Sequence, residues 1–253
     1  MPILQSSENL RFDARPRARI GLIALATDHS SEPDFHTLVS GPDIGVYTTR
    51  IVYDNPTTPE NLRRTLPRLS GAAALILPDE DLDAICYSCT SASMAIGDEA
   101  VAEAIRAGKP DVAVITPTRA VVAGLQALGA RKVDVLTPYN LETSTMMRDY
   151  VAAAGFDVLS LNYFGLEDDR QMARITPGSL VQAAVRSASP EADALFISCT
   201  ALRAAEAAAD IEAAIGRPVV TSNLATSWMA RQIVGAGAGG KNRSRARLFQ
   251  TSL

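Results

Sequence analysis

The chain has 253 residues, of which 47% are apolar and 21% are charged, a balance that is ordinary for a soluble globular protein of one or two domains. Its net charge of −4 gives no electrostatic support to nucleic acid as a partner. It has no run of roughly 18 apolar residues, so we expect neither a transmembrane helix nor a membrane partner.

The cysteines and the two ends of the chain suggest the compartment. Three cysteines are an odd number in a chain of this length, which argues against a disulfide scaffold and favours a reducing environment. Residues 1–16 are polar and lack the apolar core of a signal peptide, so we predict a cytoplasmic protein. Near the other end, Lys241, Arg243, Arg245 and Arg247 form a basic cluster that we interpret as a solvated, partly disordered tail.

The first half of the chain alternates between apolar runs that predict strands and patterns that predict helices. Residues 20–26 are typical of a buried parallel strand, and they end in a polar loop where a helix should begin. Pro67 interrupts a later helical pattern, and propensity alone also allows a strand at 73–77. The other predicted elements are strands at 44–53, 82–85 and 112–115, and helices at 58–77, 92–106 and about 118–128.

The same order of strand, polar loop and helix starts again at residue 132. Laying this second half on the first aligns Cys199 with Cys89, 110 residues apart (199 − 89), and strand order and loop type agree throughout. Two four-strand halves are the simplest account of this agreement. The predicted elements are strands at 132–136, 158–162, 194–197 and 219–223, and helices at about 141–154, 177–187, 201–215 and 225–234.

These elements predict an α/β protein with two pseudo-symmetric domains. Each domain has a four-stranded parallel sheet flanked by helices, and the active site lies in the cleft between the domains. The first domain comprises residues 17–116 and 222–253, and the second comprises residues 117–221.

Two cysteines stand in matching positions of the two halves. Cys89 and Cys199 each follow a predicted strand, precede a threonine and open into an alanine-rich helical pattern. At such a position the free N–H groups and the dipole of the helix favour a thiolate and can hold an anion. Two cysteines on opposite sides of one pocket therefore predict a paired acid–base device.

Other interpretations of these residues remain open. Cys86 fits a small buried residue, but with Cys89 it also has the spacing of a redox pair or half a zinc site. A cysteine hydrolase would need a histidine beside a thiol, and His29 stands at a strand end. Asp28, Asp169 and similar loop acids could simply cap helices. For zinc, the remaining partners Cys199, His29 and His36 stand at no recognised spacing, so we predict no metal. No glycine-rich phosphate loop follows a strand, so a nucleotide cofactor has no support.

The paired segments Ser88-Cys89-Thr90-Ser91-Ala92-Ser93 and Ile197-Ser198-Cys199-Thr200-Ala201-Leu202 resemble the aspartate/glutamate racemase superfamily. The likeness covers residues 19–234 and is greatest to the maleate cis–trans isomerase branch, which includes arylmalonate decarboxylases. Thr137-Pro138-Tyr139 also resembles that branch, and the resemblance implies that Tyr139 helps to bind a substrate carboxylate. Arylmalonate decarboxylases retain only the second cysteine, so Cys89 favours a two-cysteine isomerase or racemase.

Two positions depart from the family pattern. Asp28 and Asp169 stand where maleate isomerases typically carry asparagine. Asparagine can donate a hydrogen bond to a carboxylate, whereas an ionised aspartate can only accept one. Two such exchanges would repel a dianion and would suit a substrate with an amine or amidinium group. The segment around Asp28 also resembles proteins of ectoine utilisation, whose substrate is a cyclic amidinium acid.

The function predicted is a cofactor-independent isomerase or racemase of a small carboxylic acid, similar to maleate isomerase. Cys89 is the expected nucleophile or base and Cys199 its acid–base partner. Alternatives are a racemase of an amino or amidinium acid, an arylmalonate decarboxylase-like enzyme, or a non-catalytic binding protein. The resemblance also implies a homo-oligomer. Backbone N–H groups are expected to bind carboxylate and developing negative charge at Thr90, Ser91, Thr200 and Ala201.

Overall fold

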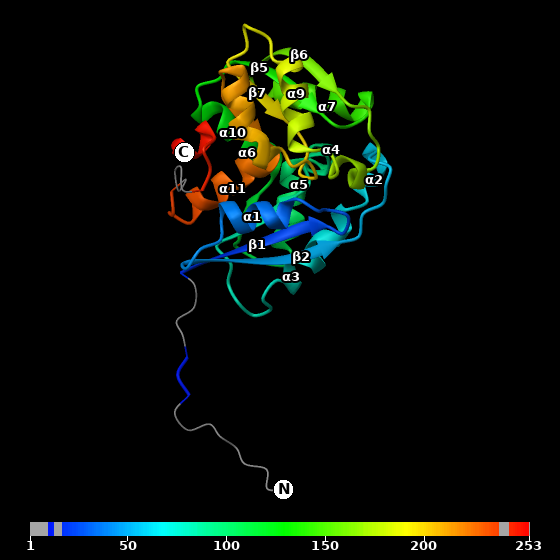
Figure 1. Cartoon of the computed structure of the whole chain (residues 1–253). Coiled ribbons are helices and arrows are strands. Elements are labelled where there is room, and N and C mark those ends of the chain that lie inside the picture. The colour runs from blue at the N-terminus through cyan, green and yellow to red at the C-terminus, as the bar shows by residue number, and fades with distance from the viewer. Residues whose placement is uncertain (1–9, 13–16, 238–242, 253) are drawn as a thin grey trace, which may run out of the picture.

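Residues 10–12, 17–237 and 243–252 are described by the computed structural model of the chain. Its strands form two four-stranded parallel sheets, in the orders β2-β1-β3-β4 and β6-β5-β7-β8. Helices flank both sheets (Figure 1). The predicted α/β class with two similar halves is therefore confirmed. In the described ranges, no helix is both long enough and apolar enough to cross a bilayer.

The first sheet is built from the residues before position 116. Its strands are β1 (Ala18–Leu25), β2 (Ile44–Ile51), β3 (Ala84–Ser88) and β4 (Ala113–Ile115). The connecting helices are α1 (Ser31–Leu38), α2 (Pro59–Arg63), the 3-10 turn η1 (Leu66–Arg68), α3 (Leu69–Leu75), α4 (Thr90–Ile96) and α5 (Asp98–Arg106). Every residue of β3 is buried, as expected for a central strand of a parallel sheet.

The second sheet repeats this order. Its strands are β5 (Lys132–Thr137), β6 (Asp157–Tyr163), β7 (Ala194–Ile197) and β8 (Val219–Thr221). The helices of this part are α6 (Pro117–Ala127), α7 (Leu141–Ala153), α8 (Asp169–Met172), α9 (Pro177–Ser187), α10 (Ala204–Ile215) and α11 (Ser222–Ile233), followed by the 3-10 turn η3 (Arg247–Gln250).

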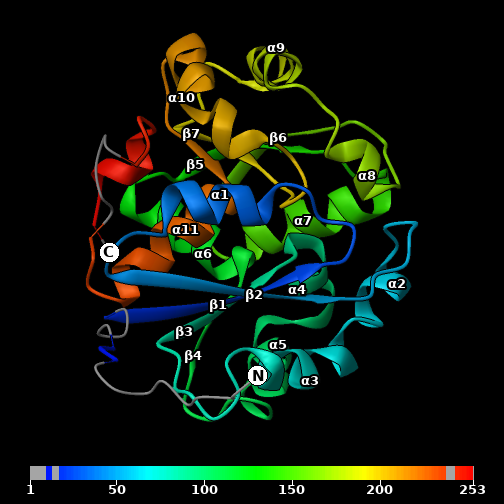
Figure 2. The ribbon, with the colours of Figure 1, turned by 60° about the horizontal axis from the view of Figure 1, so that its bottom comes forward.

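The two sheets lie at opposite ends of the molecule with a layer of helices between them (Figure 2). Helices α1, α6 and α11 lie in this layer, while α9 and α10 cover the outer face of the second sheet. Helix α6 follows the last strand of the first sheet, α11 follows the last strand of the second, and the two helices pack on each other. The proposed domain boundaries, at 116/117 and 221/222, fall at the starts of these two helices.

Several helices begin at caps that can be read from the sequence. Thr116, Asn140 and Thr221 each accept a hydrogen bond from the backbone N–H three residues further on. Pro117 follows the first of these caps, where its missing N–H costs nothing. Thr116 directly follows β4, Thr221 is the last residue of β8, and Asn140 comes three residues after β5 ends. Since each cap is this close to the end of a strand, these signals fix the short loops that form the site.

Four predicted elements differ from the structure. The strand predicted at 219–223 ends at Thr221, and Ser222 and Asn223 belong to α11. The ambiguous residues 73–77 contain no strand, because α3 covers them to Leu75. The single helix predicted at 92–106 is two helices, α4 and α5, separated by Gly97 with a φ of 97°, a value that side chains disfavour. The helix predicted from 201 begins at Ala204, because residues 200–203 form a turn after the second cysteine.

The interpretation of the C-terminal basic segment as a disordered tail is wrong for residues 243–252. Leu248 and Phe249 are fully buried and belong to the main apolar core, which joins both halves. The Arg243 guanidinium donates to the Thr37 carbonyl, and the Arg247 backbone N–H donates to the Glu212 carboxylate. Lys241 lies outside the described residues. Two apolar residues within a basic stretch therefore anchor this segment to the fold.

We predict that Phe249→Ala lowers the free energy of unfolding by about 3–5 kcal/mol, because it removes a fully buried aromatic ring and leaves a cavity. Chemical denaturation measures this loss. Arg245→Ala is the matched control, since Arg245 is exposed and makes a surface ion pair with Asp210 at 3.3 Å. It should change the free energy by less than about 0.5 kcal/mol. Equal effects of the two substitutions would show that the segment is not anchored by its apolar residues.

Candidate active site

Cys89 and Cys199 meet at one small cavity between the two halves. Cys89 is the N-cap of α4, directly after β3, and Cys199 follows β7. All nine side chains selected from the sequence line this cavity, together with Leu25, Tyr53, Thr57 and Met172. The nine are Asp28, Cys89, Thr90, Ser91, Tyr139, Asp169, Cys199, Thr200 and Ala201.

Hydrogen bonds join the two cysteine segments across the halves. The Thr90 hydroxyl donates to the Ser222 hydroxyl at 2.7 Å, and the Ser222 oxygen accepts the Cys199 N–H at 3.0 Å. In the other direction, the Thr200 hydroxyl donates to the Ser88 carbonyl at 3.2 Å. Each cysteine loop is thus held by residues next to the other cysteine, which fixes their mutual position.

Cys199 has an unusual backbone conformation. Its φ is 105°, in a region that residues with a side chain rarely adopt. Such strain costs about 1–3 kcal/mol and persists where surrounding contacts impose it, often at functional sites. Here the bond to Ser222 and those made by Thr200 impose it. The turn directs the sulfur of Cys199 to 3.9 Å from the Met172 sulfur, at the wall of the cavity.

Burial favours the protonated form of both cavity thiols, whereas the sequence predicted that the helix N-termini favour the thiolate. Burial raises the pKa of Cys89 to about 11, although the Ala92 N–H and the Ser91 hydroxyl favour its thiolate. Burial raises the pKa of Cys199 to about 12, against the opposing Ala201 N–H. The side chains are only 4% and 7% exposed, so desolvation outweighs the few N–H groups that a short helix or turn supplies.

Asp28 caps a helix and lines the cavity at the same time. Its Oδ1 accepts the N–H groups of Ser30 and Ser31 at 2.9 and 2.7 Å, and its Oδ2 accepts the Ser31 hydroxyl at 2.7 Å. These donors stabilise the start of α1. Burial raises the pKa of Asp28, while these donors and Arg50 oppose the rise. The carboxylate oxygens are therefore directed to the α1 turn.

Asp169 connects two loops that cover the cavity. Its Oδ1 accepts the Asn55 amide at 2.8 Å, and its Oδ2 accepts the Thr27 hydroxyl. Its own N–H donates to the Asn55 Oδ1 at 3.2 Å, and the Thr57 N–H donates to the Glu167 carbonyl at 2.7 Å. The space left inside is about 20 Å³, enough for about one water molecule, so this conformation leaves no room for a dicarboxylic acid.

Tyr139 lies in the wall of the cavity, fully buried, with its hydroxyl 3.2 Å from the Ser198 hydroxyl. Sequence reasoning missed Leu25, Tyr53, Thr57 and Met172 as lining residues, and Asn55, whose amide donates to the Asp169 carboxylate. Leu25 ends β1, Tyr53, Asn55 and Thr57 follow the edge strand β2, and Met172 follows the edge strand β6. The rule that sites gather at the carboxyl ends of parallel strands would have included them.

The open alternatives lose support. His29 is exposed and does not line the cavity, so no histidine is placed beside either thiol. Cys86 is fully buried in the main apolar core, away from the cavity that Cys89 lines, as expected of a small core residue. Among the described residues, no group of three or more His, Cys, Asp or Glu is arranged to hold a metal ion.

Comparisons with known proteins agree with this geometry. A family model described as arylmalonate decarboxylase matches residues 60–249. The chain is 30% identical to a maleate isomerase of Nocardia farcinica, over 72% of this chain and 75% of that protein. It is 32% identical to an arylmalonate decarboxylase of Bordetella bronchiseptica, a match that spans 49% of this chain and only 52% of that protein.

Solved structures share the fold over nearly the whole chain. A maleate cis–trans isomerase mutant of N. farcinica, with a covalently bound succinylcysteine intermediate, superposes with a TM-score of 0.82 at 24% identity, over 92% of this chain and 98% of that one. A liganded mutant of arylmalonate decarboxylase superposes with a TM-score of 0.78 at 26% identity, over 87% and 94% of the two chains.

Proposed function

Since the chain belongs to the arylmalonate decarboxylase family, we propose that it is a cofactor-independent cis–trans isomerase of a small unsaturated dicarboxylic acid such as maleate. The matched relatives are enzymes, which supports an enzyme over a non-catalytic binding protein. The observation that carries the proposal is the pair of cysteines, Cys89 and Cys199, facing one closed cavity. The 30% identity to a maleate isomerase supports the substrate class.

The proposed reaction uses one thiol for the carbon and the other for the proton. The ionised sulfur of Cys89 forms a C–S bond to one alkene carbon, and the π electrons move to the neighbouring carbon, which takes the proton of Cys199. The former double bond is now single and rotates. The Cys199 thiolate then removes the proton, the C–S bond breaks, and the trans acid leaves. Bonds and protons balance without an oxidant, a reductant or a cofactor.

The surrounding groups are proposed to hold the acid and its developing charge. The backbone N–H groups of Thr90, Ser91, Thr200 and Ala201 and the hydroxyl of Tyr139 are the proposed donors to carboxylate oxygens. Exclusion of water strengthens each of these bonds. The succinylcysteine held by the N. farcinica enzyme is an adduct of the type that this mechanism requires on Cys89.

Proton NMR in deuterium oxide tests the proposal directly. Maleate should be converted into fumarate, with no change of aspartate, glutamate, ectoine or an arylmalonate. If maleate remains unchanged, the isomerase proposal is wrong. Release of carbon dioxide from the arylmalonate would instead show a decarboxylase.

A racemase of an amino or amidinium acid is the second candidate, and the carboxylates of Asp28 and Asp169 favour it. Both residues line the cavity, but the oxygens of Asp28 are directed to the α1 turn, so Asp169 is the proposed partner of an amine or amidinium group and Asp28 adds negative charge nearby. In this reaction one thiolate removes the α-proton and the other thiol supplies a proton from the opposite face. Exchange of the α-proton for deuterium, with maleate unchanged, would establish this candidate.

Asp169→Asn separates the two candidates. For maleate, we predict that kcat/KM rises about tenfold, because the change removes a negative charge facing a dianion, and one pKa unit of interaction is about 1.4 kcal/mol. The amide keeps an oxygen for Asn55 and an NH₂ for the Thr27 hydroxyl. The control is Asp168→Asn, since Asp168 caps α8 and pairs with Arg170 outside the cavity. A fall in turnover of an amino acid, with no gain on maleate, would support the racemase.

A further inference from the structure

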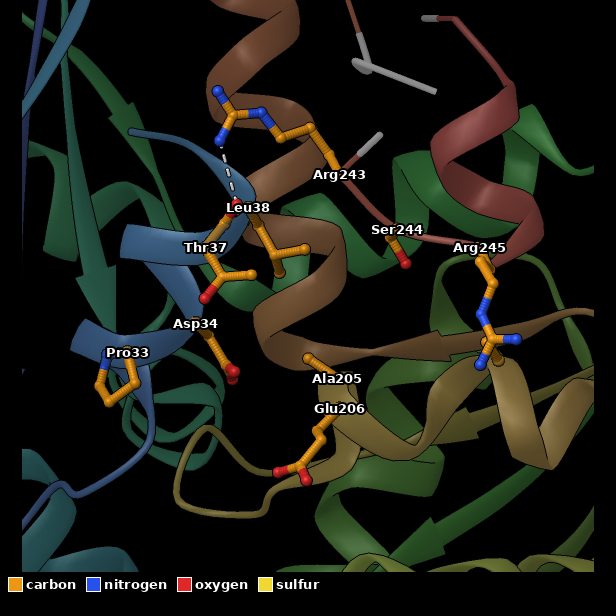
Figure 3. A pocket seen from close by; sticks show the side chains of 10 residues that line it. Pro33, Asp34, Thr37, Leu38, Ala205, Glu206, Arg243, Ser244 and Arg245 are labelled. Carbon is orange, nitrogen blue, oxygen red and sulfur yellow. Dashed lines mark hydrogen bonds between the residues drawn. The ribbon is translucent and has the colours of Figure 1, made fainter. Parts of the chain in front are cut away.

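A second and larger cavity, of about 430 Å³, lies between α1, α10 and the C-terminal segment, and it shares no lining residue with the candidate active site. Asp34 projects into it from α1, on the side of Glu206, while Arg243 and Arg245 lie on the other side (Figure 3). Nothing in the proposed mechanism uses Asp34. Its carboxylate nevertheless connects this cavity to the second cysteine.

The connection runs through Asn223, in the first turn of α11. The Asn223 Nδ2 donates to the Asp34 Oδ2 at 2.7 Å and to the Thr200 carbonyl at 2.9 Å. Both protons of the amide are therefore used. Its Oδ1, by contrast, is buried and has no hydrogen-bond partner among the residues that the structure describes. A buried acceptor without a donor is costly, so it needs an explanation.

The Thr200 carbonyl belongs to the strained turn that positions Cys199. The neighbouring Ser222 hydroxyl holds the Cys199 N–H, so adjacent residues of α11 hold both sides of this turn. Only the Asn223 bond leads to a titratable group. A change of protonation at Asp34 can therefore reach the turn through a single amide.

Asp34 titrates in the neutral range. Burial raises its pKa to about 7, and the charges of Asp28 and Glu206 add to the rise, whereas the Asn223 amide and Arg203 oppose it. From the C-terminal segment, Arg243 and Arg245 face the same cavity. Both forms of Asp34 are thus populated near pH 7.

The two forms make different demands on Asn223. Ionised Asp34 accepts the Nδ2 proton and so fixes the amide in the orientation that also holds the Thr200 carbonyl. Protonated Asp34 keeps one acceptor oxygen for Nδ2, but that bond is no longer charge-assisted and is weaker. Its hydroxyl can instead donate to Oδ1, the unused acceptor of Asn223, in a second orientation of the amide that moves Nδ2 away from the Thr200 carbonyl.

We infer that Asp34 is a positioning residue, which holds the Cys199–Thr200 turn through Asn223 when ionised and holds it less tightly when protonated. For its effect on turnover, this inference rests on the proposed role of Cys199 as acid–base partner. It adds to that role a control from outside the site, by a carboxylate that never touches the substrate.

The kinetic test compares Asp34→Asn and Asp34→Ala with the wild type between about pH 5 and 9, on maleate. Above about pH 7, wild-type kcat should rise several-fold relative to Asp34→Asn, because asparagine cannot ionise and, like protonated Asp34, offers Asn223 both a donor and an acceptor. Ionisation of the thiols affects the wild type and Asp34→Asn equally, so its effect cancels in the ratio of their kcat values at each pH. Asp34→Ala should have a kcat several-fold lower at all pH values, with KM little changed.

Glu206→Gln is the matched control, since Glu206 lines the same cavity without contacting Asn223. In this variant kcat should still change with pH relative to Asp34→Asn, but the midpoint of the change should move to lower pH. The substitution removes a charge that raises the pKa of Asp34. A pH step that persists in Asp34→Asn would overturn the inference.

A second measurement does not need turnover. The side-chain amide signals of Asn223 in ¹⁵N NMR should shift with a midpoint near pH 7 in the wild type and stay constant in Asp34→Asn. The folded pKa of Asp34 lies above its unfolded value, so its stabilising effect is full below about pH 4 and is lost as the pH rises through 7. Asp34→Asn should therefore raise Tm at pH 8 relative to the wild type, and not at pH 4.

These results separate the inference from the proposed function. If the Asn223 signals titrate as expected but no substrate turns over, the proposed function fails and the connection stands. If maleate is isomerised and the Asn223 signals do not titrate, the inference is wrong.

Discussion

Cys89→Ser is expected to lower kcat for maleate by at least about a thousandfold, because a serine hydroxyl ionises far less readily than a thiol and is a much weaker nucleophile towards an alkene. The same change at Cys199 should be of similar size, since the two residues act as a unit. It should differ in outcome: with Cys89 intact, water can still protonate the carbon slowly, but the base that removes this proton again is gone, so the adduct on Cys89 accumulates. Intact-protein mass spectrometry after mixing with maleate would detect the mass of one added acid.

Cys86→Ser is the control for this pair. Cys86 is buried in the core three residues before Cys89, and it does not line the cavity. Its replacement should affect stability and leave the chemical step unchanged. Wild-type turnover by the Cys89→Ser/Cys199→Ser double variant would contradict the mechanism for every substrate considered above.

Alkylation of Cys89 in the free enzyme is expected to accelerate about tenfold for each pH unit between about pH 7 and 10. Burial raises the pKa of this thiol to about 11, and below its pKa the thiolate fraction rises tenfold per unit. The expected gain over this range is therefore about a thousandfold. Iodoacetamide labelling followed by peptide mass spectrometry measures the rate at each cysteine separately.

Cys199 should show the same slope up to about pH 12, and Cys86 should stay unlabelled in the folded protein because it is fully buried in the core. A plateau for Cys89 already near pH 7 would show that its thiolate is stabilised, as the sequence suggested. Labelling that is equally slow at all pH values would show instead that opening of the loops joined by Asn55 and Asp169 limits access.

A raised thiol pKa is compatible with the proposed chemistry. The ionised fraction at neutral pH is small, but the nucleophilicity of a thiolate increases with its pKa. The neutral form is also the one required of Cys199, which must donate a proton to the carbon next to the new C–S bond. One thiol that ionises and one that stays protonated suit the two proposed roles.

The sequence by itself determined the features that depend on neighbours along the chain. Apolar runs predicted the strands, and caps such as Asn140 and Thr221 marked the helix starts that follow them. The matched settings of Cys89 and Cys199 predicted that both would reach one cavity, because two pseudo-symmetric halves that face each other place the ends of matching strands on opposite sides of the cleft. The family resemblance added Asp28, Tyr139 and Asp169, and all nine selected residues line that cavity.

Only the tertiary structure decided the properties that depend on what packs around a group. The direction of the thiol pKa shifts follows from desolvation by side chains of both halves, which no local pattern records. The basic C-terminal segment is ordered in residues 243–252 because Leu248 and Phe249 meet a core formed by distant elements. The link from Asp34 through Asn223 to Thr200 joins residues up to 189 positions apart. Burial and long-range hydrogen bonds are set by the assembled fold, so they become visible only when the chain is folded.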